Sequence, residues 1–172
     1  QDTATATAGF VHWGVDAIGA KYGDVTYTFT AGVGITATAT VKFVSKVAST
    51  VTVEAATATA GDKITYTITA KDSNGAGIPD GTPLTNYVAS VATTGGIAAE
   101  PTIAASNLSV AGVWTVTGTA PLISTNLTST FTLTGTAATL DTNLVAALAA
   151  TTKVVSVSVS NPGIDAAAAA AE

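Results

Sequence analysis

Residues 61–83 read GDKITYTITAKDSNGAGIPDGTP and contain a strand, a turn and the start of the next strand. In residues 63–71, apolar Ile, Tyr, Ile and Ala alternate with Lys and Thr, and this period of two predicts a strand with one buried and one solvated face. Residues 72–77 are Asp, Ser, Asn, Gly and Ala, which predict a turn, and Pro-Asp-Gly at 79–81 predicts another. This stretch therefore indicates a β protein with short turns.

The strand end and turn KDSNGAGIPDGT, at residues 71–82, resemble the second strand and following turn of bacterial Ig-like domains of the invasin/intimin type. Such domains are common in surface adhesins and surface layers. The resemblance covers residues 49–160. It implies an all-β fold, an Ig-like β-sandwich, and an extracellular, cell-surface location.

Composition limits the kinds of partner. The chain has 172 residues, enough for one large sandwich or for one domain and part of another. Charged residues make up 10%, against an average of about 25%, so Thr and Ser hydroxyls must cover much of the surface. The net charge of −5 argues against a nucleic-acid partner, whose phosphates would be repelled.

The sequence has no Cys, which removes disulfides, zinc-thiolate sites and thiol catalysis. No run reaches the roughly 18 consecutive apolar residues of a membrane span, and the first residues lack the basic and apolar regions of a signal peptide. We expect either a mature chain after signal cleavage or an internal piece of a longer chain. Both interpretations place it outside the cytoplasm.

Alternating patterns predict most of the remaining strands. These strands are expected at residues 9–13, 25–31, 35–43, 51–55, 84–93, 113–120, 128–136 and 153–160, with one or two short ones within 97–108. Asp141-Thr142-Asn143 could cap one or two turns of helix. Residues 1–8 are expected to be a flexible arm or an edge strand. The tail after residue 161 is expected to be a linker or disordered end, with a short Ala-rich helix as the alternative.

The two halves of the chain repeat. Residues 8–13 parallel 111–114, residues 26–30 parallel 129–134, and residues 40–45 parallel 155–160. The first half thus looks like the last three strands of an Ig-like domain whose earlier strands are missing. We therefore predict three segments: an arm with a partial Ig-like unit (1–46), an Ig-like β-sandwich (47–161) and an Ala-rich tail (162–172).

A three-strand partial sandwich leaves its apolar face in water, at a cost of about 1.5–3 kcal/mol for each large side chain. Its open edge also invites strand addition from another chain. We expect a neighbour to complete this unit, either a further domain of a longer array or another subunit. The alternative is that all strands join one larger sandwich. The residues expected to take part in assembly are Gln1, Thr3, Thr5, Thr7, Phe10, Trp13, Tyr27 and Phe29.

The sequence offers little catalytic chemistry. His12 has no second His, no Cys and no nucleophile-type Ser near it in the sequence, so a strand surface position is favoured over a catalytic base. The acidic residues fall mainly in turns, which explains most of them without a glycosidase pair. We interpret the chain as a non-enzyme without an organic cofactor.

Asp72, Asn74 and Asp80 could offer oxygen ligands to Ca²⁺, although their spacing departs from the EF-hand pattern and ordinary turn formation is the alternative. Asn107 and Asn126 begin N-x-[ST] matches for N-glycosylation.

Two further features concern a covalent link and the aromatic residues. Lys63 or Lys71 near Glu54 are candidates for an isopeptide bond, as known in sandwich domains of surface fibres. The two tryptophans, Trp13 and Trp114, would form either a sugar platform or part of the core.

The sequence therefore predicts an extracellular structural protein that forms a homo-oligomer or polymer, as a surface layer or filament. Assembly would use β-sandwich edges, with donor-strand exchange as one route. The alternative is an adhesin or carbohydrate-binding Ig-like module that recognises a surface glycan or receptor through loops such as residues 72–81.

Overall fold

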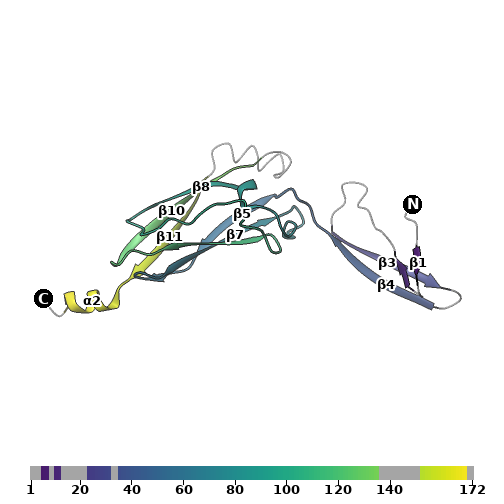
Figure 1. The fold of residues 1–172 in the computed structure, drawn as a ribbon, viewed down its shortest axis with the longest axis horizontal. Coiled ribbons are helices and arrows are strands. Elements are labelled where there is room, and N and C mark those ends of the chain that lie inside the picture. The colour runs from purple at the N-terminus through teal and green to yellow at the C-terminus, as the bar shows by residue number, and fades with distance from the viewer. Residues whose placement is uncertain (1–4, 8–9, 13–22, 32–34, 136–151, 170–172) are drawn as a thin grey trace. The chain divides into compact units, whose positions relative to one another are not determined.

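The computed structural model describes residues 5–7, 10–12, 23–31, 35–135 and 152–169. The chain forms two compact units, residues 1–43 and 44–172. Strands dominate both units, as Figure 1 shows. The predicted all-β class is confirmed.

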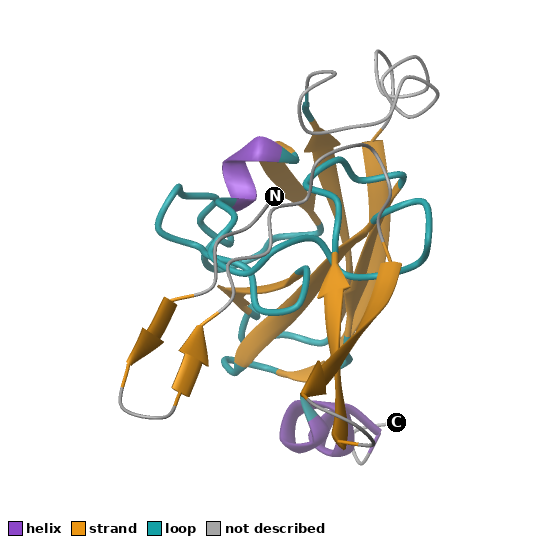
Figure 2. Ribbon diagram, turned by 90° about the vertical axis from the view of Figure 1, so that its right-hand side faces the viewer, coloured by secondary structure: helices purple, strands orange, loops and turns teal. Residues whose placement is uncertain are grey.

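The larger unit is a β-sandwich, whose strands appear in two layers in Figure 2. One sheet has the order β5-β7-β9 and the other has the order β6-β11-β10-β8. The strands are β5 (Thr50–Ala55), β6 (Ala58–Thr59), β7 (Lys63–Lys71), β8 (Val88–Thr94), β9 (Val113–Thr119), β10 (Thr125–Leu133) and β11 (Thr152–Ser160).

The strand order is that of an Ig-type sandwich. β5, β7 and β9 take the places of strands A, B and E, while β8, β10 and β11 take those of C, F and G. The first strand is split between the sheets, since β5 pairs antiparallel with β7 and β6 pairs parallel with β11. Each half of this split strand closes the same side of the sandwich.

The core follows from the alternation along β7, whose predicted bounds are confirmed. Ile64, Tyr66, Ile68 and Ala70 are all buried, whereas Lys63 and Lys71 are exposed. The ring of Tyr66 packs against Phe131 of the opposite sheet, with ring centroids 5.3 Å apart. One stripe of alternating residues therefore joins the two sheets.

A chain of hydroxyl groups runs from this core to the surface. The Tyr66 hydroxyl lies 2.7 Å from Ser129 Oγ, and Ser129 Oγ lies 2.9 Å from Thr93 Oγ1. Thr93 Oγ1 donates to the exposed carboxylate of Glu100 at 2.8 Å. The buried tyrosine hydroxyl thus has a partner, which removes the cost of burying it unpaired.

Residues 97–100 close the other side of the sandwich. Ala99 and Thr119 of β9 exchange backbone hydrogen bonds, and Glu100 Oε1 accepts the Thr93 amide of β8 at 2.6 Å. The segment therefore connects the edges of both sheets. The short strands predicted within 97–108 appear only as isolated bridges, because these residues cross between sheets instead of running along one.

The smaller unit contains two separate two-stranded ladders among its described residues. β1 (Thr5–Thr7) pairs with β2 (Phe10–His12), and β3 (Gly23–Ala31) pairs with β4 (Ile35–Phe43). The three strands predicted in succession do not form one sheet, since β2 pairs with the predicted arm. The repeat accounts for this separation. β9 is the counterpart of β2, and it also lies in a different sheet from β10 and β11, the counterparts of β3 and β4.

Two further segments differ from expectation. The predicted strand at 84–93 begins with a 3-10 turn, Leu84–Asn86, before β8. The tail forms helix α2 (Pro162–Ala169) where a linker or disordered end was the main expectation. Asn161 Oδ1 accepts the Ile164 amide, and Pro162 stands at the first helical position, so local capping starts this helix. The helix predicted after Asp141 lies outside the described residues.

Replacing the hydroxyl that pairs with Tyr66 is expected to destabilise the sandwich. Ser129→Ala leaves the buried tyrosine hydroxyl without this partner, and we expect a loss of about 1–3 kcal/mol in unfolding free energy. Urea denaturation followed by fluorescence measures it. The control Ser156→Ala, at an exposed position of β11, is expected to change stability by less than about 0.5 kcal/mol. Equal effects of the two substitutions would contradict the role of the buried pair.

Tyr87 makes stability depend on pH in the alkaline range. Its side chain is buried, its hydroxyl donates to Lys46 O, and burial raises its pKa from 10.0 to about 12. The native state then holds the proton more tightly than the unfolded chain, so this stabilisation is complete below pH 10 and is lost between pH 10 and 12. We expect a fall of about 2–3 kcal/mol over that interval. In Tyr87→Phe, chemical denaturation at each pH should show a correspondingly smaller fall.

Candidate functional site

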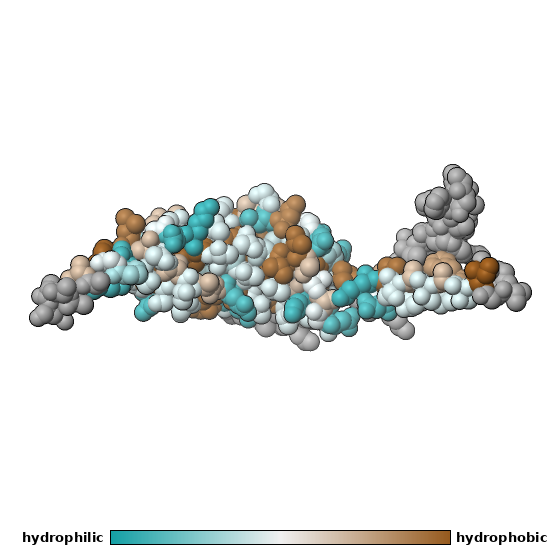
Figure 3. All heavy atoms as spheres, turned by 90° about the horizontal axis from the view of Figure 1, so that it is seen from below, coloured by the Kyte–Doolittle hydropathy of each residue, from teal (hydrophilic) through white to brown (hydrophobic). Residues whose placement is uncertain are grey.

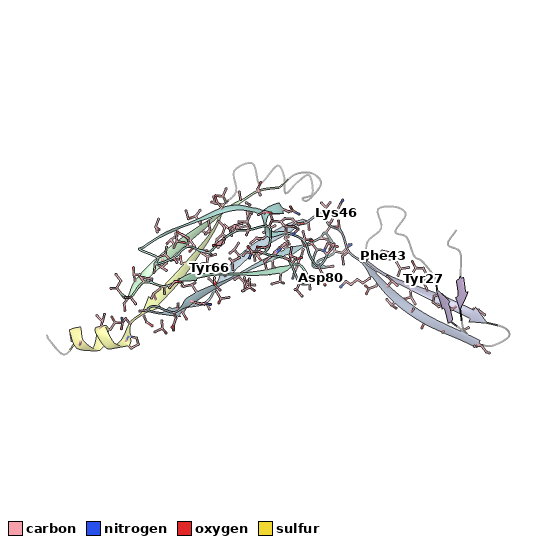
Figure 4. All side chains as sticks on the ribbon, in the orientation of Figure 1. Tyr27, Phe43, Lys46, Tyr66 and Asp80 are labelled. Carbon is pink, nitrogen blue, oxygen red and sulfur yellow. The ribbon has the colours of Figure 1, made fainter. Side chains whose placement is uncertain are left out.

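The hairpin β3–β4 has one continuous apolar face. Its ladder pairs odd-numbered residues with odd-numbered residues, so the side chains of both strands that share this parity lie on the same face. Tyr27 and Phe43, on neighbouring strands, are labelled in Figure 4. The face comprises Val25, Tyr27, Phe29, Ile35, Ala37, Ala39, Val41 and Phe43, with Gly23 at one end; we call it the hairpin face.

Much of the hairpin face is accessible to solvent. Ile35 is 67% exposed, and Val25 and Val41 are each 37% exposed. Tyr27 and Phe43 are half-buried. Figure 3 shows apolar colouring along one side of this hairpin. An accessible apolar face of this kind makes the hairpin a candidate interaction surface.

The opposite face of the hairpin is polar along its whole length. Asp24 pairs with Lys42, and the ladder then pairs only Thr with Thr. The hydroxyls of Thr26 and Thr40 lie 3.0 Å apart. The charges of the hairpin therefore stand on the face that water covers, and none stands on the hairpin face.

The repeat provides an internal comparison. Residues 26–30 align with 130–134, which places Tyr27 at the position of Phe131 and Phe29 at that of Leu133. In the sandwich, Phe131 is fully buried and Leu133 is 6% exposed, because the sheet β5-β7-β9 covers them. The β3 half of the hairpin face thus has the same pattern of large apolar residues as a strand that an opposite sheet covers.

Two of the three predicted calcium ligands, Asp72 and Asp80, accept hydrogen bonds from backbone amides. Asp72 is buried, and its carboxylate accepts the amides of Asn74 and Ala76 through Oδ1 and of Ser45 through Oδ2. Asp80 Oδ1 accepts the Ala111 amide at 2.5 Å. No cluster of three His, Asp or Glu suited to a metal ion occurs among the residues that the structure describes. The calcium site stays a prediction.

The two glycosylation candidates differ in surroundings. Asn107 is half-buried, and its Oδ1 accepts the Ala104 amide at 2.8 Å. Asn126 is exposed on β10 opposite Ser158. Modification of either residue is untested, and Asn126 is the more accessible of the two.

The structure does not bring the isopeptide candidates together. Glu54 lies opposite Thr67 in the ladder between β5 and β7. Lys63 and Lys71 are each four residues from Thr67 along the same strand, about 13 Å at the usual rise per residue. All three charged side chains are exposed, and the register explains why this pairing was wrong.

Trp114 belongs to the core, so the sugar-platform interpretation fails for it. Its side chain is 1% exposed, packs on Tyr87 with ring centroids 5.3 Å apart, and donates from Nε1 to Thr82 O at 2.8 Å. Trp13 lies outside the described residues.

The predicted assembly residues fall in three places. Tyr27 and Phe29 lie on the hairpin face. Thr5, Thr7 and Phe10 belong to the ladder β1–β2, where Thr7 pairs with Phe10 and Thr5 with His12. Gln1 and Thr3 lie outside the described residues. The predicted assembly residues include none from β4, although the apolar face of this strand was also expected to be left partly in water. Its alternation was visible in residues 35–43, but the register that places Ala39 beside Tyr27 was not.

No protein-family model matches the chain, and no curated protein sequence matches it. The resemblance to invasin/intimin-type domains therefore stays a prediction. In the part of the chain that the structure describes, no helix is long and apolar enough to cross a membrane.

Asp72 is expected to stabilise the turn that leads out of β7. Asp72→Ala removes three acceptor contacts at a buried position, and we expect a loss of about 2–4 kcal/mol in unfolding free energy. Asp72→Asn keeps the Oδ1 acceptor but can place an amide donor against the Ser45 amide, so its effect should be smaller than that of Ala. Asp62→Ala, at an exposed turn position, is the control. Thermal and urea denaturation compare the three, and an effect of Asp72→Ala no larger than the control would contradict this role.

Proposed function

We propose that this chain is an extracellular structural protein that self-assembles into a surface layer or filament. The observation that carries the proposal is the hairpin face, an apolar surface of β3–β4 that is partly accessible, whereas Phe131 and Leu133, the residues of β10 that correspond to Tyr27 and Phe29, are buried. A neighbouring copy supplies the cover. The extracellular location rests on the resemblance to surface domains.

The energetics support an intermolecular contact. A two-stranded ladder is marginal in water and gains stability when another layer packs on its apolar side. Covering the accessible parts of Val25, Ile35 and Val41 removes apolar area from water, and each square ångström contributes about 25 cal/mol. The hairpin is therefore more stable in an assembly than alone.

The sandwich supports a proposal in which the smaller unit, and not the larger one, makes the assembly contact. Its two sides are closed by the split first strand and by residues 97–100, which limits uncontrolled pairing of sheet edges. A closed sandwich suits the rigid body of a building block. Assembly contacts are then left to the smaller unit.

Charge placed on the hairpin face is expected to prevent assembly. In Val41→Glu a carboxylate would have to be buried at the contact, so we expect loss of species larger than the monomer. Light scattering after size exclusion, over a range of concentrations, together with negative-stain images, measures this. The matched control Thr38→Glu places the same charge on the polar face of the same strand and should leave assembly within about threefold of the wild type.

Two results would overturn the proposal. One is a wild-type chain that stays monomeric at every concentration tested. The other is equal loss of assembly in Val41→Glu and Thr38→Glu, which would assign the effect to net charge. Circular dichroism on both variants checks that the sandwich remains folded.

A further inference from the structure

The hairpin face has a regular pattern of sizes across its two strands. Gly23 stands beside Phe43, Tyr27 beside Ala39, and Phe29 beside Ala37. Each of these pairs joins one aromatic ring to a residue with little or no side chain. Val25 and Val41 form a pair of equal size. The larger residue of a pair therefore lies on β4 at one end of the face, at Phe43, and on β3 further along, at Tyr27 and Phe29.

We infer that a second copy of this chain docks on the hairpin face, about a two-fold axis that lies between the two sheets and parallel to the strands. The inference rests on the proposed self-assembly and specifies its contact. A rotation by half a turn about this axis does not change a residue's position along the strand direction. It places β3 of each copy over β4 of the other. Tyr27 then faces Ala39 of the second copy, and Phe43 faces Gly23.

This axis matches the sizes of three pairs. Where one copy presents Tyr27 or Phe43, the other presents Ala39 or Gly23, and Val25 faces Val41 in both directions. Packed sheets interdigitate in this way when large and small residues face each other. The interface is isologous, because the same surface serves both copies.

The other in-plane axis, perpendicular to the strands, does not fit. It places β3 over β3 with the heights reversed, and Tyr27 is the middle residue of Gly23–Ala31. Tyr27 would then face itself, while Ala39, the middle of Ile35–Phe43, would also face itself. Ring would lie against ring beside an unfilled gap, and both overpacking and gaps cost stability.

The hairpin face is a place where charge does not oppose a second copy. The chain carries a net charge of −5, so two copies repel each other over much of their surfaces. The hairpin face has no ionisable carboxylate or ammonium group, and Asp24 and Lys42 stand opposite each other on the other face. Docking there desolvates no ion.

Area sets the strength of the contact. Nine-residue strands are about 30 Å long, and a two-stranded face is about 10 Å wide, so each copy contributes roughly 300 Å². The total is below the roughly 1,200 Å² of stable interfaces. The contact is therefore weak and reversible in an isolated pair, and it gains strength when several copies are linked in one assembly.

Exchanging the sizes of one pair tests the axis. Tyr27→Ala leaves a gap over Ala39, and Ala39→Tyr places a ring over a ring, so each variant alone should associate at least about tenfold more weakly than the wild type. Sedimentation velocity over a concentration series gives the dissociation constants. Thr38→Tyr adds the same bulk on the polar face and should change association less than about threefold.

Mixing the two variants is the decisive measurement. Under the proposed axis, Ala at position 27 of one copy meets Tyr at position 39 of the other, and Tyr27 of the second meets Ala39 of the first. The mixture should therefore form heterodimers at concentrations where each variant alone is monomeric, with association within about threefold of the wild type. The double variant Tyr27→Ala/Ala39→Tyr should regain self-association as well.

The outcomes separate the two proposals. If the wild type assembles but neither the mixture nor the double variant recovers, the axis is wrong and the proposed self-assembly still stands. If the single variants associate as well as the wild type, or if Thr38→Tyr weakens association as much as Ala39→Tyr, the hairpin face is not the contact. A wild type that remains monomeric overturns both proposals.

Discussion

Side chains alternate across a β-strand, so every amphipathic sheet in this chain has an apolar face that must be covered. In the larger unit the alternation along β7 satisfies this constraint, because Tyr66 and its neighbours meet Phe131 and the opposite sheet. In the smaller unit the same alternation produces the hairpin face, which stays accessible at Ile35. The core of one unit and the proposed contact of the other thus have one physical origin.

The sequence was sufficient for the elements that depend on alternation alone. The bounds of β7 and β4 agree with prediction, since uninterrupted alternation and flanking turn residues define both ends. It was insufficient where a contact distant in the chain decides the structure. Residues 97–100 run between two sheets because of Thr93 and Thr119, and neither contact leaves a local pattern.

The candidate site was predicted in part for the same reason. Tyr27 and Phe29 stand out as large residues among threonines, and the sequence identified them. Ala37 and Ala39 carry no such signal, and they matter only because the register places them beside aromatic rings. Asp72 was predicted as a calcium ligand because carboxylate oxygens in a turn are common ligands. In the structure both of its oxygens accept backbone amides, a contact that the sequence did not reveal, and the calcium site stays a prediction.

The split first strand also determines how the larger unit would carry mechanical load. β6 near its start and β11 near its end run parallel, with Ala58 opposite Val159 and Thr59 opposite Ser160. Tension between the two termini of this unit pulls these strands past one another along their length. Their hydrogen bonds are then strained in shear together instead of being peeled apart one at a time, so we expect the unit to resist stretching along this direction.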